Sequence, residues 1–433
     1  MAEAAPLTEI PQLPIPPGGG AEWVTGADGA KLRAALFAPK GPARGSVVLS
    51  TGRTEAIEKY FEVVGELLER GFVVLIQEWR GQGLSHRELP DRLKGHATGH
   101  APYLADYHAL LAHFEDRLPK PWIAVGHSMG GCLTLLALAR GEASRFAGAM
   151  LCAPMLGVNV PPLASLLVGF NLLLGRAGGY ARPPADPYHE PFEGNVLTGD
   201  KRRFLRGRAL IDANRDLALG GPTWGWLDFA LKSTAYLAKP QNLAGVKIPV
   251  VIASAEKDQL VRADAQRAAA DNLPDGKFVN VPGAQHEILM ETDEKRAVFW
   301  DAFDALADRV APKPAPEPKA EPAPKAAAKP KAAAKPAAPT KAKPAAKSAP
   351  AKAAPPAKAP AKPKATPTKK ASAGKPPVAK AASAKAAPKP KAVAPKKPAA
   401  QKTTASKPAA VAPAKAAPAR ASAPKAPASR KKT

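Results

Sequence analysis

The chain has 433 residues and a formal net charge of +26, but this charge is concentrated at one end. Of the 63 basic and 37 acidic residues, 30 basic and 2 acidic ones lie in 311–433, which leaves residues 1–310 with a net charge of −2. The balance predicts a near-neutral globular body, long enough for one large α/β core with an insertion, followed by a basic tail, and the two cysteines exclude a disulfide framework.

The first twenty residues contain two acids, five prolines and no basic residue. They lack the charged and apolar regions of a secretory signal peptide. We therefore expect a flexible N-terminal segment over 1–20 and a cytoplasmic protein.

Residues 21–153 alternate short apolar runs with helical segments. A turn signal at Asp28-Gly29 predicts a hairpin that gives the sheet an antiparallel start. The alternation that follows implies a mostly parallel sheet with helices on both faces, the first part of an α/β core. In chain order we expect strands over 46–50, 72–77, 122–125 and 146–152, and helices over 55–70, 103–118 and 132–140.

The sequence Gly126-His127-Ser128-Met129-Gly130 stands where the strand over 122–125 meets a helix. A G-x-S-x-G sequence in that context is typical of a nucleophile elbow, because the glycines permit a sharp turn that exposes the serine hydroxyl. The motif predicts a serine hydrolase with Ser128 as its nucleophile.

The alternation stops over 154–246, which indicates a cap or lid inserted into the core. No charged residue occurs in 146–175, but several prolines interrupt it, so we expect a core strand followed by an apolar lid helix over 163–174 instead of a membrane span. That helix could line an acyl pocket or rest on a lipid surface. A basic cluster follows, in which Arg202, Arg203 or Arg206 could meet a phosphate or an anionic membrane, although a solvated helix face also explains it.

The alternation resumes over 247–310, the second part of the core, which a helix over 289–310 closes. Asp258 lies in the loop after an apolar strand over 248–253, and His286 lies in the loop after a strand over 277–281. A serine hydrolase of this type needs an acid and then a histidine in this order. The predicted catalytic triad is therefore Ser128, Asp258 and His286.

An acyl-transfer site also needs hydrogen-bond donors for the developing oxyanion. The backbone N–H of Met129, directly after the nucleophile, is the first candidate. The loop Thr51-Gly52-Arg53 leaves the strand over 46–50, and the N–H of Arg53 is the second candidate.

The tail over 311–433 repeats Lys, Ala and Pro without a strict period. Frequent prolines defeat the helix propensity of its alanines, so we expect disorder. Its spaced charges could bind a polyanion, such as nucleic acid or an anionic surface, through many weak and salt-sensitive contacts; a solubilising tail without a partner is the alternative.

Five stretches of the body carry a family resemblance, namely Thr51-Gly52-Arg53 with Glu55 and Tyr60, then 78–85, 126–131, 220–227 and 283–287. On these stretches, residues 20–310 resemble the monoacylglycerol lipase and lysophospholipase L2 branch of the α/β-hydrolase superfamily, also grouped as serine aminopeptidase S33-like hydrolases. The resemblance implies an eight-stranded sheet under a mobile apolar cap, with hydrolysis of single-chain lipid esters. It also implies the roles given above for the triad, Arg53 and Met129. The tail resembles linker histones in composition only.

Together these features predict a cytoplasmic serine hydrolase that cleaves a lysophospholipid or a monoacylglycerol and needs neither a metal nor a cofactor. A small-ester or peptide hydrolase of the same fold is one alternative. A polyanion-binding protein held by its tail is another, and the two functions can coexist. Peripheral membrane contact through the cap is expected, without an integral span.

Overall fold

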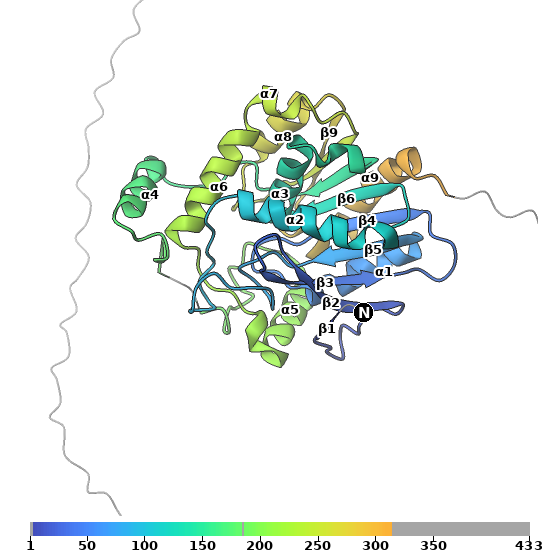
Figure 1. Ribbon diagram of the computed structural model, residues 1–433, viewed down its shortest axis with the longest axis horizontal. Helices are drawn as coiled ribbons and strands as arrows, with labels where there is room; N and C mark the ends of the chain where they lie inside the picture. The colour runs from blue at the N-terminus through green and yellow to red at the C-terminus, as the bar shows by residue number, and fades with distance from the viewer. Residues whose placement is uncertain (1–2, 184–185, 314–433) are drawn as a thin grey trace, which may run out of the picture. The chain divides into compact units, whose positions relative to one another are not determined.

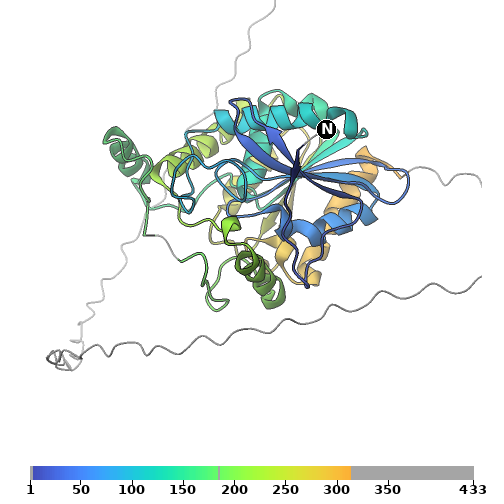
Figure 2. The ribbon, with the colours of Figure 1, turned by 60° about the horizontal axis from the view of Figure 1, so that its bottom comes forward.

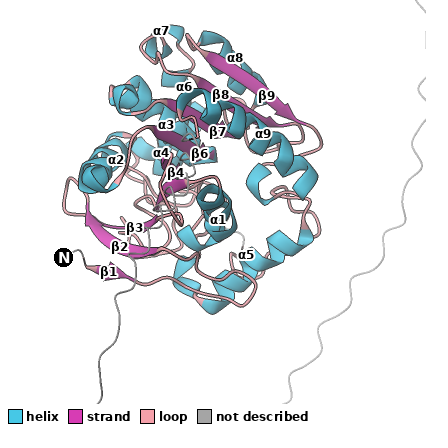
Figure 3. Cartoon of the chain, turned by 90° about the vertical axis from the view of Figure 1, so that its right-hand side faces the viewer, coloured by secondary structure: helices cyan, strands magenta, loops and turns pink. Residues whose placement is uncertain are grey.

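The computed structural model describes residues 3–183 and 186–313, and within these ranges nine strands form one sheet. Figure 3 shows the sheet from β1 at one edge to β9 at the other, in the order β1-β2-β3-β5-β4-β6-β7-β8-β9. The pairs among β1, β2, β3 and β5 are antiparallel, and all pairs from β5 to β9 are parallel. The strands are β1 (Ala4–Ala5), β2 (Gly19–Thr25), β3 (Lys31–Phe37), β4 (Gly45–Ser50), β5 (Phe72–Gln77), β6 (Trp122–His127), β7 (Gly148–Cys152), β8 (Val250–Ala255) and β9 (Gly276–Val281).

The predicted fold class, a mostly parallel sheet covered by helices, is confirmed. Central strands such as β4 are buried on both faces, because Val48 packs into one core and Val47 and Leu49 into the other. Helices α2 and α3 cover the first face, and α1 and α9 cover the second (Figure 2). The helices are α1 (Phe61–Glu69), α2 (Ala101–Phe114), α3 (Ser128–Ala139), α4 (Ala164–Leu173), α5 (Lys201–Ala213), α6 (Trp224–Leu237), α7 (Pro240–Leu243), α8 (Ala263–Asn272) and α9 (Asp293–Val310).

The N-terminal segment is more ordered than we expected from its prolines. Ala4 and Ala5 form β1 on the edge of β2, which gives the sheet one strand more than the eight expected. Ile10 and Leu13 are buried in the core on the α1 side of the sheet. Two buried apolar side chains and a strand pairing therefore hold residues 4–13, so the expectation of a flexible segment over all of 1–20 is corrected.

The segment between β7 and β8 forms the cap and contains α4, α5, α6 and α7. Figure 1 shows α4, the first helix of this segment, standing away from the sheet to the left of α6. The apolar helix predicted over 163–174 corresponds to α4, which spans Ala164–Leu173. Among the described residues, no helix combines the length and apolar character that crossing a membrane requires.

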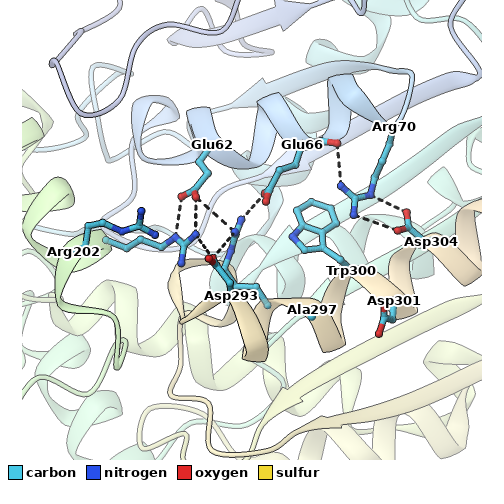
Figure 4. Close-up of a pocket in the computed structure, with 11 residues that line it drawn as sticks. Glu62, Glu66, Arg70, Arg202, Asp293, Ala297, Trp300, Asp301 and Asp304 are labelled. Atoms are coloured by element: carbon cyan, nitrogen blue, oxygen red, sulfur yellow. Dashed lines mark hydrogen bonds and ion pairs between the residues drawn. The ribbon is translucent and has the colours of Figure 1, made fainter.

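Two arginines of the basic cluster form a structural clamp, whereas the side chain of Arg202 is 69% exposed and lies 3.9 Å from the carboxylate of Asp200. Arg203 of α5 is buried, and its guanidinium lies 2.6 Å from both the Glu62 and the Asp293 carboxylates. Arg206 also pairs with Glu62. Figure 4 shows these carboxylates converging from α1 and α9 in a hollow that none of Ser128, Asp258 and His286 lines. Arg203 and Arg206 therefore tie the cap to the core, and the idea that they bind a phosphate or a membrane is corrected.

The globular part extends slightly beyond α9. Ala311 is buried, and its carbonyl accepts a hydrogen bond of 2.7 Å from the Nε of Arg44. The remainder of the tail that we predict over 311–433 lies outside the described residues from position 314 onward.

Candidate active site

The predicted nucleophile stands at the junction of β6 and α3. Ser128 has a φ of +50°, a left-handed conformation that side chains rarely adopt and that is typical of strained functional positions. A Cβ at Gly130 would lie 2.4 Å from the carbonyl oxygens of both Ser50 and Thr51, so only glycine fits there. The helix begins at Ser128 itself, four residues before its predicted start at 132, because the two glycines of its first turn weaken the helical signal.

The structure brings the other two predicted triad residues to the same place. Asp258 follows β8 and His286 follows β9, and these strands run parallel to β6. Ser128 Oγ lies 2.8 Å from His286 Nε2, and His286 Nδ1 lies 2.7 Å from Asp258 Oδ2. Ser128 is only 8% exposed and His286 only 4%. Three side chains distant in sequence thus form one hydrogen-bonded line in a largely dry setting.

The carboxylate at the end of this line is fully engaged. Its Oδ1 accepts the backbone N–H groups of Leu260 and Val261 at 2.8 and 3.0 Å, while Oδ2 faces His286. Burial by itself raises the pKa of Asp258, but the hydrogen bond and charge of His286 and the two backbone donors outweigh it, so the pKa lies below its ordinary value. Asp258 is therefore ionised near neutral pH.

The two predicted oxyanion donors lie directly after Ser128, at Met129, and in the loop after β4, at Arg53. Met129 is the second residue of α3, and the first N–H groups of a helix have no partner within it. The loop after β4 is fixed from behind, since Trp79 Nε1 donates to the Thr51 carbonyl at 2.9 Å and Gln82 Nε2 to the Gly52 carbonyl at 2.7 Å. Within the described ranges the backbone N–H of Arg53 donates to no protein acceptor. Both N–H groups thus remain available to a ligand.

A buried polar network beneath the site was not predicted from the sequence. His127 Nδ1 lies 3.0 Å from Glu55 Oε2, which also accepts the N–H of Gly52 and the hydroxyl of Tyr60. Burial opposes both charges, yet each stabilises the other, so the pKa of Glu55 lies well below its ordinary value and that of His127 above it. Glu55 therefore links the loop before Arg53 to the residue before the nucleophile.

The same network reaches the catalytic histidine through its backbone. The carbonyl oxygen of His286 lies 3.3 Å from His127 Nε2, and Lys59 bridges Glu55 to Glu287, the next residue along. In the sequence, His127 occupies the variable position of G-x-S-x-G, and Glu55 is the acid that follows Thr51-Gly52-Arg53-Thr54. Neither carries a pattern that reveals a pairing across 72 positions.

Among the described residues, no group of three or more His, Cys, Asp or Glu side chains could hold a metal ion.

Comparison with known proteins places the chain in a family. Residues 41–293 match the family model of serine aminopeptidase S33. Lysophospholipase L2 of Escherichia coli strain K12 is 32% identical over 303 residues, covering 66% of this chain and 85% of that protein. Monoacylglycerol lipase of Mycolicibacterium smegmatis is 24% identical over 276 residues, covering 62% and 91%. A soluble variant of monoglyceride lipase from Saccharomyces cerevisiae, solved with a substrate analogue, shares the fold with a TM-score of 0.56 at 20% identity, covering 71% and 99%.

Proposed function

The chain belongs to the serine aminopeptidase S33 family and is an ester hydrolase, and from this premise we propose that it cleaves the carboxylic ester of a single-chain lipid through an acyl-Ser128 intermediate. The observation that carries the proposal is the continuous hydrogen-bonded line Ser128–His286–Asp258. Lysophospholipids and monoacylglycerols are the substrates of the relatives by their names, and they are the substrate class that we propose here.

In the proposed mechanism His286 Nε2 accepts the proton of Ser128 as Oγ bonds to the acyl carbonyl carbon. The negative charge that develops on the carbonyl oxygen is stabilised by the N–H groups of Arg53 and Met129. The tetrahedral intermediate collapses, the bond to the leaving alcohol breaks, and His286 returns the proton to that oxygen. A water molecule activated by His286 then repeats the sequence, releasing the fatty acid and restoring Ser128.

Asp258 keeps its negative charge and orients the imidazole, since its second oxygen is fixed by two backbone N–H groups. It stabilises the imidazolium without taking its proton. Glu55 and His127 have a positioning role. Glu55 accepts the N–H of Gly52 in the loop that carries Arg53, and His127 contacts the backbone carbonyl of His286.

The acyl-chain preference tests this proposal. We expect kcat/KM on p-nitrophenyl esters to rise from acetyl to decanoyl, because an apolar cap gains free energy by covering a longer chain, and amino-acid arylamides to be poor substrates. The measurement is initial-rate kinetics below the micellar concentration of each ester. A preference for acetyl esters would favour the small-ester alternative, and efficient cleavage of arylamides would favour a peptidase.

The exposed face of α4 supports a further part of the proposal, contact with a lipid surface. Six large apolar side chains at helical spacing remain between 47% and 84% exposed, while Val168 and Asn171 face the protein. Such a stripe without charged residues suits the interfacial layer of a bilayer. The exposed residues are Leu163, Leu166, Leu167, Phe170, Leu173 and Leu174.

We expect the double variant Leu166→Ser/Phe170→Ser to bind neutral phosphatidylcholine vesicles at least about tenfold more weakly, since burying one such side chain stabilises by about 1.5–3 kcal/mol. Vesicle co-sedimentation measures the effect. Leu205→Ser is the matched control, because Leu205 is also 50% exposed in the cap but lies on α5. Equal weakening by the control, or no weakening by the double variant, would exclude α4 as the contact.

A further inference from the structure

Among the residues that the structure describes, the side chain of Arg53 forms no ion pair. Its Nη2 donates to the carbonyl of Gly220, and its guanidinium lies over the Trp226 ring, 5.1 Å from the centroid. Arg53 as a residue is partly exposed, but its Nε is sealed from solvent and donates to no atom of the described residues. A buried donor without an acceptor is costly, so this guanidinium is poised for a ligand.

The fully buried arginines of the described residues are neutralised by carboxylates, whereas the half-buried Arg87 resembles Arg53, because it donates to backbone carbonyls and its Nε has no acceptor there. Arg33 pairs with Glu58 and Glu78, and Arg203 pairs with three carboxylates. Within residues 3–183 and 186–313, by contrast, no carboxylate lies at ion-pair distance from Arg53. Burial and, after it, the positive charge of Arg182 lower the pKa of Arg53 to about 10, so the group is still a cation near neutral pH. Among the described residues, the positive charge of Arg53 is therefore not balanced by a neighbouring carboxylate.

The guanidinium belongs to the catalytic end of the molecule. The guanidinium lies over Trp226, whose indole N–H donates to the Sδ of Met129 at 3.4 Å. Met129 is the residue directly after the nucleophile. Gly95 supports the other side, where a Cβ would come within 2.5 Å of Arg53 Nη2. The cap residues Gly220 and Trp226 and the core residue Gly95 thus enclose a cation whose own backbone N–H is the second predicted oxyanion donor.

The dimensions fit a particular substrate. The backbone nitrogen of an arginine is separated from its guanidinium carbon by as many covalent bonds as separate the ester carbonyl carbon from the phosphorus in a 1-acyl lysophospholipid. A substrate whose carbonyl oxygen contacts the Arg53 N–H can therefore extend its phosphate beside the side chain of the same residue. Guanidinium and phosphate form strong, directional hydrogen bonds, and Arg is favoured where such groups are recognised.

We propose that the Arg53 guanidinium binds the phosphate of a lysophospholipid whose acyl ester lies at Ser128, and that this contact selects phosphate-bearing lipids over neutral monoacylglycerols. The inference rests on the proposed function and deepens it. Free phosphate offers the same chemistry, so the experiment includes it as a separate arm.

The test compares kcat/KM of the full chain on 1-oleoyl lysophosphatidylcholine and on 1-oleoylglycerol, which carry the same acyl ester. We expect kcat/KM on the lysophospholipid, divided by kcat/KM on the glyceride, to fall at least about tenfold in Arg53→Met, because a charge-assisted contact is lost. The same ratio should recover in part in Arg53→Lys. Gly95→Ala, which displaces the guanidinium without removing it, should lower the same ratio. The matched control is Arg70→Met: Arg70 also lies over a tryptophan, 4.1 Å from the Trp300 centroid, but pairs with Asp304 outside the site, and the ratio should not change.

The outcomes separate the two proposals. If both substrates lose the same factor in Arg53→Met, or neither changes, the phosphate contact is wrong while the proposed hydrolase stands. If wild type cleaves neither lipid, the proposed function and this inference both fail. Inhibition of p-nitrophenyl ester hydrolysis by inorganic phosphate in wild type, lost in Arg53→Met, would support the contact with free phosphate as an occupant; equal inhibition of both would count against it.

Discussion

Ser128→Ala is expected to lower the turnover of a soluble p-nitrophenyl ester by about a million-fold, the usual cost of removing a catalytic serine. The reason is geometric: Ser128 Oγ is the atom 2.8 Å from His286 Nε2, and alanine leaves the imidazole without a proton to accept. Labelling with a fluorophosphonate probe measures the same loss directly, since the probe forms its bond with the activated oxygen. We expect strong labelling of wild type and none of the variant.

Ser144→Ala is a suitable control for this experiment. Ser144 is exposed, and its hydroxyl makes only a long contact of 3.5 Å with the Gly141 carbonyl, so its removal should change neither labelling nor turnover. Thermal unfolding of both variants should match wild type, because neither change empties a core position. Persistent labelling of Ser128→Ala would show that another residue is the nucleophile.

The order of strands explains why the three triad positions could be predicted together. The carboxyl ends of parallel strands meet at one edge of a sheet, so residues that follow β6, β8 and β9 come close although 158 positions separate Ser128 from His286. Only the order of the strands and the periodicity of their apolar residues are needed for that inference. Distances and protonation states are not contained in such a pattern.

Ion pairs between charged residues that are far apart in the sequence could not be predicted in this way. The run that contains Arg203 has the composition of a solvated helix face, but Glu62, 141 positions away, turns it into a buried clamp. Glu55 and His127 are a second example, because a lone acid and a lone histidine carry no periodic signal. The edge strand β1 was missed because two alanines are too short a run to show an alternation.

Replacing Asp258 by asparagine is expected to lower kcat by about ten-thousand-fold with little change in KM for a soluble ester. The reason lies in how its oxygens are used. Oδ1 accepts the N–H groups of Leu260 and Val261, so the oxygen of an asparagine will take that position and its NH₂ group will face His286. An NH₂ donor requires an acceptor at Nδ1, which places the imidazole proton on Nε2, where it can no longer accept the proton of Ser128.

The lowered pKa of Asp258 also fixes how this effect should depend on pH. The pKa of Asp258 lies below the ordinary value of an aspartate, so the carboxylate of the wild type is ionised throughout the neutral range. Its contribution to kcat is lost only when the pH falls through this lowered pKa. The ratio of wild-type to variant kcat should therefore stay high from about pH 6 to about pH 8. Asp264→Asn is the control, since Asp264 is exposed and pairs with Arg262 at the surface. A loss below about tenfold would mean that Asp258 does not set the tautomer, because the asparagine side chain preserves the shape of the carboxylate and changes only which atom of the imidazole carries hydrogen.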